Sequence, residues 1–280
     1  MRWLGVPELP EVETIARELH DRLTGRTIVE TQVVRSDVLR EVTPDRLAQC
    51  CLNAVILGVG RRGKSAVIRL SGAAFLVIQP RFTGAVLLHD PGTLASHDAY
   101  STIEWLLADG GRFRYRDVRR LGTVTLLDTA GIAAYDARIG DEPLDPAFTA
   151  DRLSVLLRGS RAAVKKVLMD QRVVAGVGNI YANEALWIAG VDPSRSARLL
   201  SADEVCTLHQ ALVRTLVASI GARGTTFRDY RDPSNRQGGF ASQLQAYGRG
   251  GAPCTRCGTT LVETHAIDGR STVFCYRCQG

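Results

Sequence analysis

The strongest chemical signal in the sequence is a set of four cysteines near its carboxyl end. Cys254 and Cys257 form one C-x2-C pair, and Cys275 and Cys278 form a second pair after a spacer of seventeen residues. This spacing is typical of a tetrahedral zinc site with four thiolate ligands. Disulfides and a redox C-x2-C motif are the alternatives. The odd total of seven cysteines, the lack of a secretory signal and the absence of a βαβ pattern argue against them. We therefore expect one structural Zn2+ that stabilises a small β-hairpin.

A second group of chemically capable residues lies near the amino terminus. Residues 7–14 read PELPEVET and bring together two prolines and three carboxylates. A buried carboxyl can act as a general acid or base when burial raises its pKa. The structural alternative is an acidic first turn of a helix, opened by Glu11 or Thr14. Such a helix would place one apolar face inward, made of Val12, Ile15, Ala16, Leu19 and Leu23.

Three further stretches combine glycine with basic or amide side chains. The turn at residues 176–179 reads GVGN and runs into a helix-forming segment, an arrangement that exposes backbone N–H groups to a phosphate. Residues 61–64 read RRGK and residues 117–122 read DVRRLG, each between apolar runs. The structural alternative for residues 176–179 is a plain helix–turn–helix corner, and the alternative for the two basic turns is a solvated hairpin tip.

Taken together, these motifs resemble the formamidopyrimidine-DNA glycosylases of the Fpg/Nei family. PELPEVET, RRGK, the longer string around GVGNIY and the cysteine hairpin occur in the family's order and cover nearly the whole chain. The resemblance implies a bifunctional DNA glycosylase/AP lyase that excises oxidised purines, formamidopyrimidines and 8-oxoguanine, from duplex DNA. In this family the amine of an amino-terminal proline attacks C1′ of the damaged nucleotide and forms a Schiff base.

The resemblance implies catalytic roles for four residues. Pro7 would be the nucleophile and Glu8 would handle protons. Lys64, in the RRGK turn, and Arg270, in the Asp-Gly-Arg tip of the zinc hairpin, would assist β- and δ-elimination. The hairpin spacer is one residue longer than is usual in the family. Glu11 and Glu184 match family residues that line the site, with roles that the sequence does not separate.

The resemblance also implies DNA contacts. Phe82 stands where the family has a methionine that fills the gap left by the flipped base, and Arg119 matches the arginine that reads the opposite base. Leu121 replaces an aromatic wedge. In the helical region, Arg161, Lys165 and Asn179 match phosphate contacts, and residues 224–230 resemble a loop that closes over the base. Either His97 or Tyr100 takes the place of a DNA-contacting histidine.

The amino terminus departs from the family pattern. Met1–Val6 precede Pro7, and a proline within a chain has no nucleophilic amine. One explanation is that translation starts at the valine codon of position 6 and that the initiator is then removed. The other is that the extension is real and blocks the enzyme until it is processed. We favour the first explanation.

Composition and periodicity agree with a DNA-binding protein of several domains. The 280 residues carry 35 Lys and Arg against 29 Asp and Glu, a net charge of +6, and no apolar run has the length of a membrane span. Short β-type runs fill residues 27–135 and helical spacing follows a linker at 139–146. Several strands at this spacing suggest a sandwich or a barrel. The resemblance implies an α+β multidomain protein: a two-sheet β-sandwich with flanking helices at 1–140, a helix–two-turn–helix domain with the base-closing loop at 141–239, and a zinc-finger hairpin at 240–280.

The expected partner is damaged double-stranded DNA, and no membrane partner is expected. We expect the protein to be a monomer in a cytoplasm of the bacterial type. Two other functions remain open. One is a non-catalytic damaged-DNA-binding protein with a blocked amine, and the other is a Nei-like glycosylase that prefers oxidised pyrimidines.

Overall fold

The structure is a computed structural model that describes residues 6–93 and 98–280. Its contacts form two compact units, which are described separately. The first unit contains the chain up to Ala137 together with Ala222–Gly239, and the second contains Arg138–Gly221 and Phe240–Gly280. The expected sheets, helical region and cysteine hairpin are all present.

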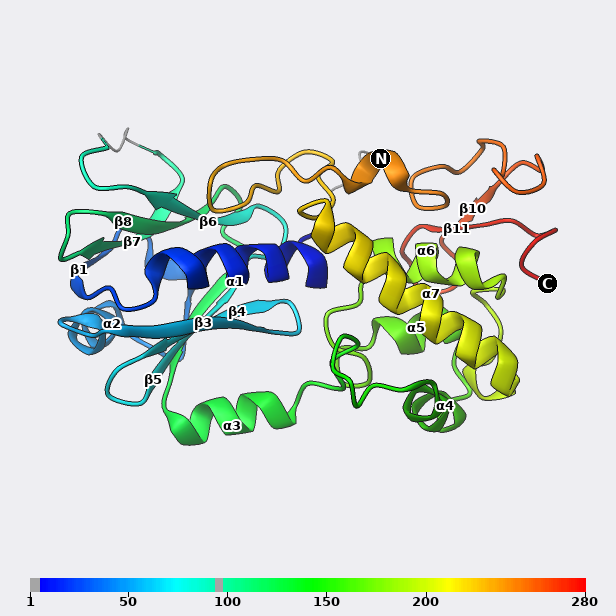
Figure 1. Ribbon diagram of the computed structural model, residues 1–280, viewed down its shortest axis with the longest axis horizontal. Helices are drawn as coiled ribbons and strands as arrows, with labels where there is room; N and C mark the ends of the chain where they lie inside the picture. Colours follow the sequence, from blue (N-terminus) through cyan, green and yellow to red (C-terminus); the bar gives the residue numbers. More distant parts are fainter. Residues whose placement is uncertain (1–5, 94–97) are drawn as a thin grey trace. The chain divides into compact units, whose positions relative to one another are not determined.

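The first unit is a β-sandwich with one long helix, α1 (Leu9–Leu23), packed along β3 and β4 (Figure 1). One sheet has the order β2-β9-β5-β4-β3, and the other has the order β1-β7-β8-β6. Every neighbouring pair is antiparallel except β2 and β9. The strands are β1 (Ile28–Val33), β2 (Leu39–Arg40), β3 (Ile56–Arg62), β4 (Ser65–Leu70), β5 (Ala74–Gln79), β6 (Gly84–His89), β7 (Ser101–Leu107), β8 (Arg112–Asp117) and β9 (Thr123–Leu127).

Both sheets and α1 contribute to one apolar core. Ile15 and Leu19 of α1, Ile68 of β4 and Trp105 of β7 are fully buried in it. The indole of Trp105 stacks on Phe113 with the ring centroids 4.6 Å apart. This core fixes the face that each strand presents, and it therefore fixes where the turns between the strands emerge.

Helix α1 begins earlier than the sequence analysis expected. Its first residue is Leu9, so the expectation that Glu11 or Thr14 opens the helix is wrong. Proline is well tolerated in a first turn because no backbone N–H is needed there, and Pro10 occupies that turn. Glu8 is the N-cap and forms a capping box with Glu11.

Two further helices accompany the sandwich, as expected, although the sequence analysis did not give their bounds. α2 (Pro44–Cys51) is capped by the Thr43 hydroxyl and has proline in its first turn. α3 (Thr129–Ala137) has no buried residue and therefore no apolar stripe that would reveal it in the sequence.

The second unit consists of helices and the cysteine hairpin. The helices are α4 (Ala150–Arg158), α5 (Val164–Met169), α6 (Asn179–Ala189) and α7 (Ala202–Gly221), and the hairpin strands are β10 (Val262–Thr264) and β11 (Thr272–Phe274). A capping box opens α7: Glu204 N donates to Ser201 Oγ at 3.3 Å, and Ser201 N donates to Glu204 Oε2 at 2.8 Å. Short 3-10 turns occur at Ser36–Val38, Ala197–Leu199 and Phe240–Gln243.

Among the described residues, no helix combines the length and the apolar character that crossing a bilayer requires.

Candidate active site and nucleic-acid interface

The first turn of α1 gathers the residues expected to perform the chemistry. Pro7 is buried and directly precedes Glu8, whose side chain is 3% exposed. Glu11 Oε2 accepts from Glu8 N at 2.8 Å, and Glu11 Oε1 accepts from Thr225 N at 2.6 Å. Glu11 therefore holds the 222–239 segment against the helix start, while the Glu8 carboxylate lies at the positive end of the helix dipole.

The Lys64 turn is fixed by the same helix. β3 and β4 pair up to Arg62 and Ser65, so Gly63 and Lys64 form the tip of this hairpin. Arg61 Nε donates to Glu13 Oε2 at 2.8 Å, and Arg61 Nη1 donates to the Gly63 carbonyl at 2.9 Å. Burial raises the pKa of Glu13, but hydrogen bonds from Arg61 and Arg17 outweigh it and leave the pKa below its ordinary value. An ionised Glu13 thus orients the backbone beside Lys64.

Two loops that the sequence presented separately are joined in the structure. The Arg119 guanidinium lies over the Phe82 ring, 5.1 Å from its centroid. The loops are linked because Arg119 N donates to Thr83 Oγ1 at 2.9 Å and to Asp117 Oδ1 at 3.2 Å. The two expected DNA contacts, Phe82 and Arg119, therefore share one surface.

Asp117 organises this pair of loops and was missed as a site residue by the sequence analysis. Its side chain is 1% exposed and accepts from Gly122 N at 2.8 Å, from Tyr115 Oη at 3.2 Å and from the Thr83 hydroxyl. Burial and the Asp117 carboxylate raise the pKa of Tyr115, which keeps this phenol protonated as a donor. Gly122 is required here, since a Cβ atom would lie 1.8 Å from the Tyr115 hydroxyl.

The remaining candidates of the first unit lie at its surface. Leu121 is 39% exposed and follows Arg119 in the same loop. Tyr100 is 47% exposed and lies under the Arg116 guanidinium, whose carbon is 5.1 Å from the ring centroid. His97, the other candidate for the DNA-contacting position, is outside the described residues.

In the second unit, two expected phosphate ligands converge on the zinc hairpin. Asn179 Nδ2 donates to the Ser271 carbonyl at 2.9 Å, and Lys165 Nζ donates to the same carbonyl at 3.1 Å. Lys165 is fully buried; it also donates to Thr272 Oγ1 at 2.7 Å and lies 3.5 Å from Asp268 Oδ1. Lys165 thus braces the hairpin tip, and its role as a direct phosphate ligand stays a prediction.

Arg161 and Arg270 are exposed, as DNA-contacting side chains must be. Arg270 follows the tight turn in which its own backbone N–H donates to Asp268 Oδ1 at 3.0 Å. Because Lys165 contacts the residues on either side of Arg270, the buried lysine sets the pose of the exposed arginine.

The GVGN turn has the expected tight geometry. Gly176 adopts φ +77° and its N–H donates to Gln171 Oε1 at 2.9 Å, while Gln171 Nε2 donates to the Val177 carbonyl at 2.7 Å. Glu184, in α6, is buried and accepts from the backbone N–H groups of residues 245–247 at 2.8–2.9 Å. Glu184 therefore has a structural contact within its own unit, whereas Glu11 belongs to the helix start of the first unit.

The four cysteines fit a single zinc ion. The ligand atoms of Cys254, Cys257, Cys275 and Cys278 lie within 4.8 Å of one another. A tetrahedral Zn–S4 centre with bonds of about 2.3 Å separates its sulfurs by about 3.8 Å. The expected ligand set is thus assembled. The hairpin is also joined to α6, because Arg256 Nη1 and Nη2 donate to the carbonyls of Trp187 and Ile188 at 2.8 Å.

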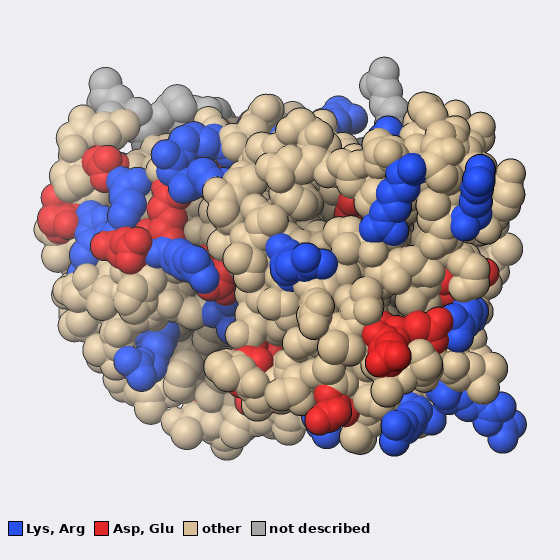
Figure 2. Space-filling model, turned by 45° about the vertical axis from the view of Figure 1, so that its right-hand side comes forward, with Lys and Arg blue, Asp and Glu red and all other residues tan. Residues whose placement is uncertain are grey.

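Figure 2 shows one face of the molecule, on which basic and acidic side chains lie next to one another. The net charge of +6 is therefore not concentrated in a single basic patch on this face. Recognition of a polyanion would depend on individually placed cations.

Comparisons with known proteins agree along the whole chain. The family model "Formamidopyrimidine-DNA glycosylase N-terminal domain" matches residues 6–124, "Formamidopyrimidine-DNA glycosylase H2TH domain" matches residues 139–231, and "Zinc finger found in FPG and IleRS" matches residues 251–280. A formamidopyrimidine-DNA glycosylase of Chloroflexus aurantiacus is 39% identical over 98% of both chains, and one of Moorella thermoacetica is 43% identical over 91% of this chain and 93% of its own.

Solved structures show the same fold. A mutant Lactococcus lactis FPG in complex with DNA containing Fapy-dG has a TM-score of 0.89 at 31% identity, with 98% of this chain and 99% of that chain covered. The MutM (FPG) protein from Thermus thermophilus has a TM-score of 0.86 at 34% identity, with the same coverage.

Proposed function

Because the chain belongs to the formamidopyrimidine-DNA glycosylase family, and is thus a base-excision repair enzyme that acts on damaged DNA, we propose that Pro7 is its nucleophile. The observation that carries this proposal is the first turn of α1. It places Pro7 directly before two buried carboxylates, one of which also holds the 222–239 segment. The family model begins at residue 6, so the matched region starts just before this proline.

The chemistry begins with the free secondary amine of Pro7, once residues 1–6 are absent. Its lone pair attacks C1′ of the flipped nucleotide, the C1′–N bond to the base breaks, and the base leaves with a proton. The sugar ring opens to an iminium that links C1′ to the proline nitrogen. Glu8 supplies or accepts the protons, since its carboxyl group lies next to the nucleophile in a buried environment.

Two eliminations follow from the iminium. Loss of a proton from C2′ expels the 3′ phosphate, and a second elimination expels the 5′ phosphate and leaves a one-nucleotide gap. We assign Lys64 and Arg270 to these steps as cations that stabilise the departing phosphates. Glu13 and Arg61 orient the turn of Lys64, and Lys165 orients the tip of Arg270. The zinc ion holds the hairpin and takes no part in bond making.

The DNA contacts follow from the exposed surfaces. Phe82 and Leu121 would fill the gap left by the flipped base, and Arg119 would contact the base opposite it. Arg161 and Asn179 would bind phosphates at the helical unit. Oxidised purines are the proposed lesions, in line with the Fapy-dG present in complexes of the Lactococcus lactis enzyme. We further propose a monomer that acts in the bacterial cytoplasm.

The test is borohydride trapping of the Schiff base on a duplex that contains one abasic site. Protein that starts at Pro7 should give a covalent adduct and a gapped strand, whereas protein that retains residues 1–6 should bind the duplex without an adduct. Pro7→Gly should lose most of the excision of formamidopyrimidine and 8-oxoguanine. Pro44→Ala is the matched control, since Pro44 is an exposed proline in the first turn of α2.

Two results would overturn the proposal. An adduct of equal yield from the extended protein would exclude the Pro7 amine as nucleophile. Retained binding without any adduct from the Pro7 form would indicate the non-catalytic damaged-DNA-binding alternative. An excision panel that includes oxidised pyrimidines tests the Nei-like alternative with the same protein.

A further inference from the structure

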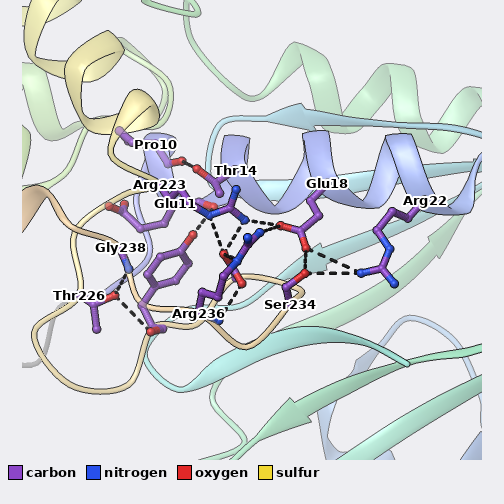
Figure 3. A network of polar contacts seen from close by, with 12 residues as sticks. Pro10, Glu11, Thr14, Glu18, Arg22, Arg223, Thr226, Ser234, Arg236 and Gly238 are labelled. Carbon is purple, nitrogen blue, oxygen red and sulfur yellow. Dashed lines mark hydrogen bonds and ion pairs between the residues drawn. The ribbon is translucent and has the colours of Figure 1, made fainter. Parts of the chain in front are cut away.

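A group of charged residues joins the 222–239 segment, here called the capping loop, to α1. Its centre is Asp232, which is fully buried. Figure 3 shows Arg223 and Arg236 of the loop beside Glu18 of the helix. Asp232 Oδ2 accepts from Arg223 Nε at 2.7 Å and from Arg236 Nε at 3.1 Å, and Asp232 Oδ1 accepts from Arg236 N at 2.8 Å. A single carboxylate therefore ties the start of the capping loop to its last residues.

The same two arginines also reach α1. Arg223 Nη2 pairs with Glu18 Oε2, and Arg236 Nη2 lies 3.3 Å from the same oxygen. The Ser234 hydroxyl donates to Glu18 Oε1. The side chain of Glu18 is 12% exposed. Glu18 and Asp232 thus share two guanidinium groups, and we call these four residues the acid anchor.

The charges of the acid anchor balance, which makes it a cooperative unit. Two carboxylates face two guanidinium groups, and Asp232 is out of contact with water. Neutralising Asp232 removes the buried partner that both guanidinium groups share, and neutralising Glu18 removes the carboxylate that ties them to α1. The anchor should therefore loosen as a whole when Glu18 or Asp232 loses its charge.

The contacts divide the capping loop into fixed ends and an exposed tip. Thr225 is held by Glu11, and the Tyr230 hydroxyl donates to the Glu11 carbonyl at 3.3 Å. On the other side, Leu88 N of β6 donates to the Pro233 carbonyl at 2.9 Å. Between these ends, Phe227 is 37% exposed and the Arg228 side chain is 64% exposed.

We propose that the acid anchor positions the capping loop for base excision and has little influence on the cleavage of a strand that has already lost its base. This inference rests on the proposed function. The tip can cover a flipped nucleobase only if the ends of the capping loop are fixed. A loop with mobile ends is rarely in the productive pose. An abasic site has no base to cover, so its elimination depends on Pro7 and not on the pose of the tip.

The experiment compares two reactions of the same variants in protein that starts at Pro7. Asp232→Asn and Glu18→Gln remove the charge of the anchor, and Asp21→Asn removes an exposed carboxylate of α1 as the matched control. Single-turnover excision of 8-oxoguanine opposite cytosine should fall about tenfold or more for the anchor variants, a barrier increase of about 1.4 kcal/mol. Cleavage of a preformed abasic site should change less than about twofold. The control should match the parent protein in both reactions.

Limited trypsin digestion tests the anchor without any DNA. Cleavage after Arg228 in the tip should become several-fold faster in the anchor variants than in Asp21→Asn, because a loosened loop opens more often. Thermal unfolding checks that each variant is folded at the assay temperature. Glu18→Gln, at the edge of the anchor, serves where Asp232→Asn is too unstable.

Equal losses of excision and abasic-site cleavage would overturn the proposal, since they would indicate general damage to the unit. Unchanged excision in both anchor variants would also overturn it, as would unchanged trypsin cleavage of the tip. If the parent protein cleaves neither substrate, the proposed function fails, while the digestion still decides whether the anchor holds the loop.

Discussion

Replacement of Asp117 by asparagine should damage the surface that carries Phe82 and Arg119. The carboxylate is buried and accepts hydrogen bonds from Tyr115, Gly122 and Arg119 as well as from Thr83. Asparagine has the same shape, but its amide group can present only one accepting atom. The NH2 group at the other position would face donors, whichever way the amide is turned.

The size of the effect follows from those contacts. With the amide nitrogen at the Oδ2 position, the Gly122 N–H and the Tyr115 hydroxyl lose their acceptor. A buried donor without a partner costs about 1–3 kcal/mol, so two of them give a loss of about 2–4 kcal/mol after partial relaxation. For a chain of this size, about 2–4 °C of melting temperature correspond to 1 kcal/mol, and we expect a decrease of about 4–16 °C.

Scanning calorimetry of Asp117→Asn measures this decrease, and Asp21→Asn is the control because Asp21 is exposed on α1. Excision opposite each of the four bases measures the functional effect. Discrimination between opposite bases should weaken because the loop that carries Arg119 loses its closing hydrogen bond from Gly122 N to Asp117. An unchanged melting temperature together with unchanged discrimination would show that Asp117 does not organise these loops.

Two other predictions concern the zinc hairpin and α1. Cys275→Ala should release zinc and abolish binding to an abasic-site duplex, whereas Cys206→Ala, which changes an exposed cysteine outside the cluster, should retain both zinc and binding. A chromogenic zinc assay and a binding titration measure the two effects. Full binding after zinc loss would contradict the structural role of the ion. Glu13 has a pKa below its ordinary value of 4.5, so its contribution to stability is present above that pH and is lost as the pH falls through the lowered value. Urea denaturation between pH about 6 and about 3 should therefore show a larger loss of stability for the parent protein than for Glu13→Gln, and parallel curves would refute the Glu13–Arg61 assignment.

The strands could be predicted closely because their signals are local. β4 and β7 are two of the short β-type runs expected within residues 27–135, and each run of β-branched or apolar residues ends at a turn signal. The start of α1 was misplaced because glutamate is an unusual N-cap, so Glu8 was overlooked in favour of Glu11 or Thr14. α3 gave no signal, since none of its residues is buried.

The site was less predictable because its contacts join residues far apart in the sequence. The RRGK and DVRRLG turns looked like solvated tips, and no local pattern shows that Thr83 donates to Asp117 across 34 positions. Lys165 was expected to face phosphate, but its partner Thr272 lies 107 positions away and buries it. Cysteine spacing was the exception, because a four-sulfur zinc site constrains the sequence itself.

One helix nevertheless accounts for much of the arrangement in the first unit. Three carboxylates of α1 hold two segments. Glu13 holds the Lys64 turn through Arg61, while Glu11 holds the capping loop at Thr225 and Glu18 holds the same loop through the acid anchor. Burial of the apolar face of α1 fixes the rotation of the helix, so these side chains cannot turn independently of the core. The position of Pro7, the pose of the Lys64 turn and the ends of the capping loop are thus set by the packing of a single element, and a core substitution beneath α1 should disturb all three together.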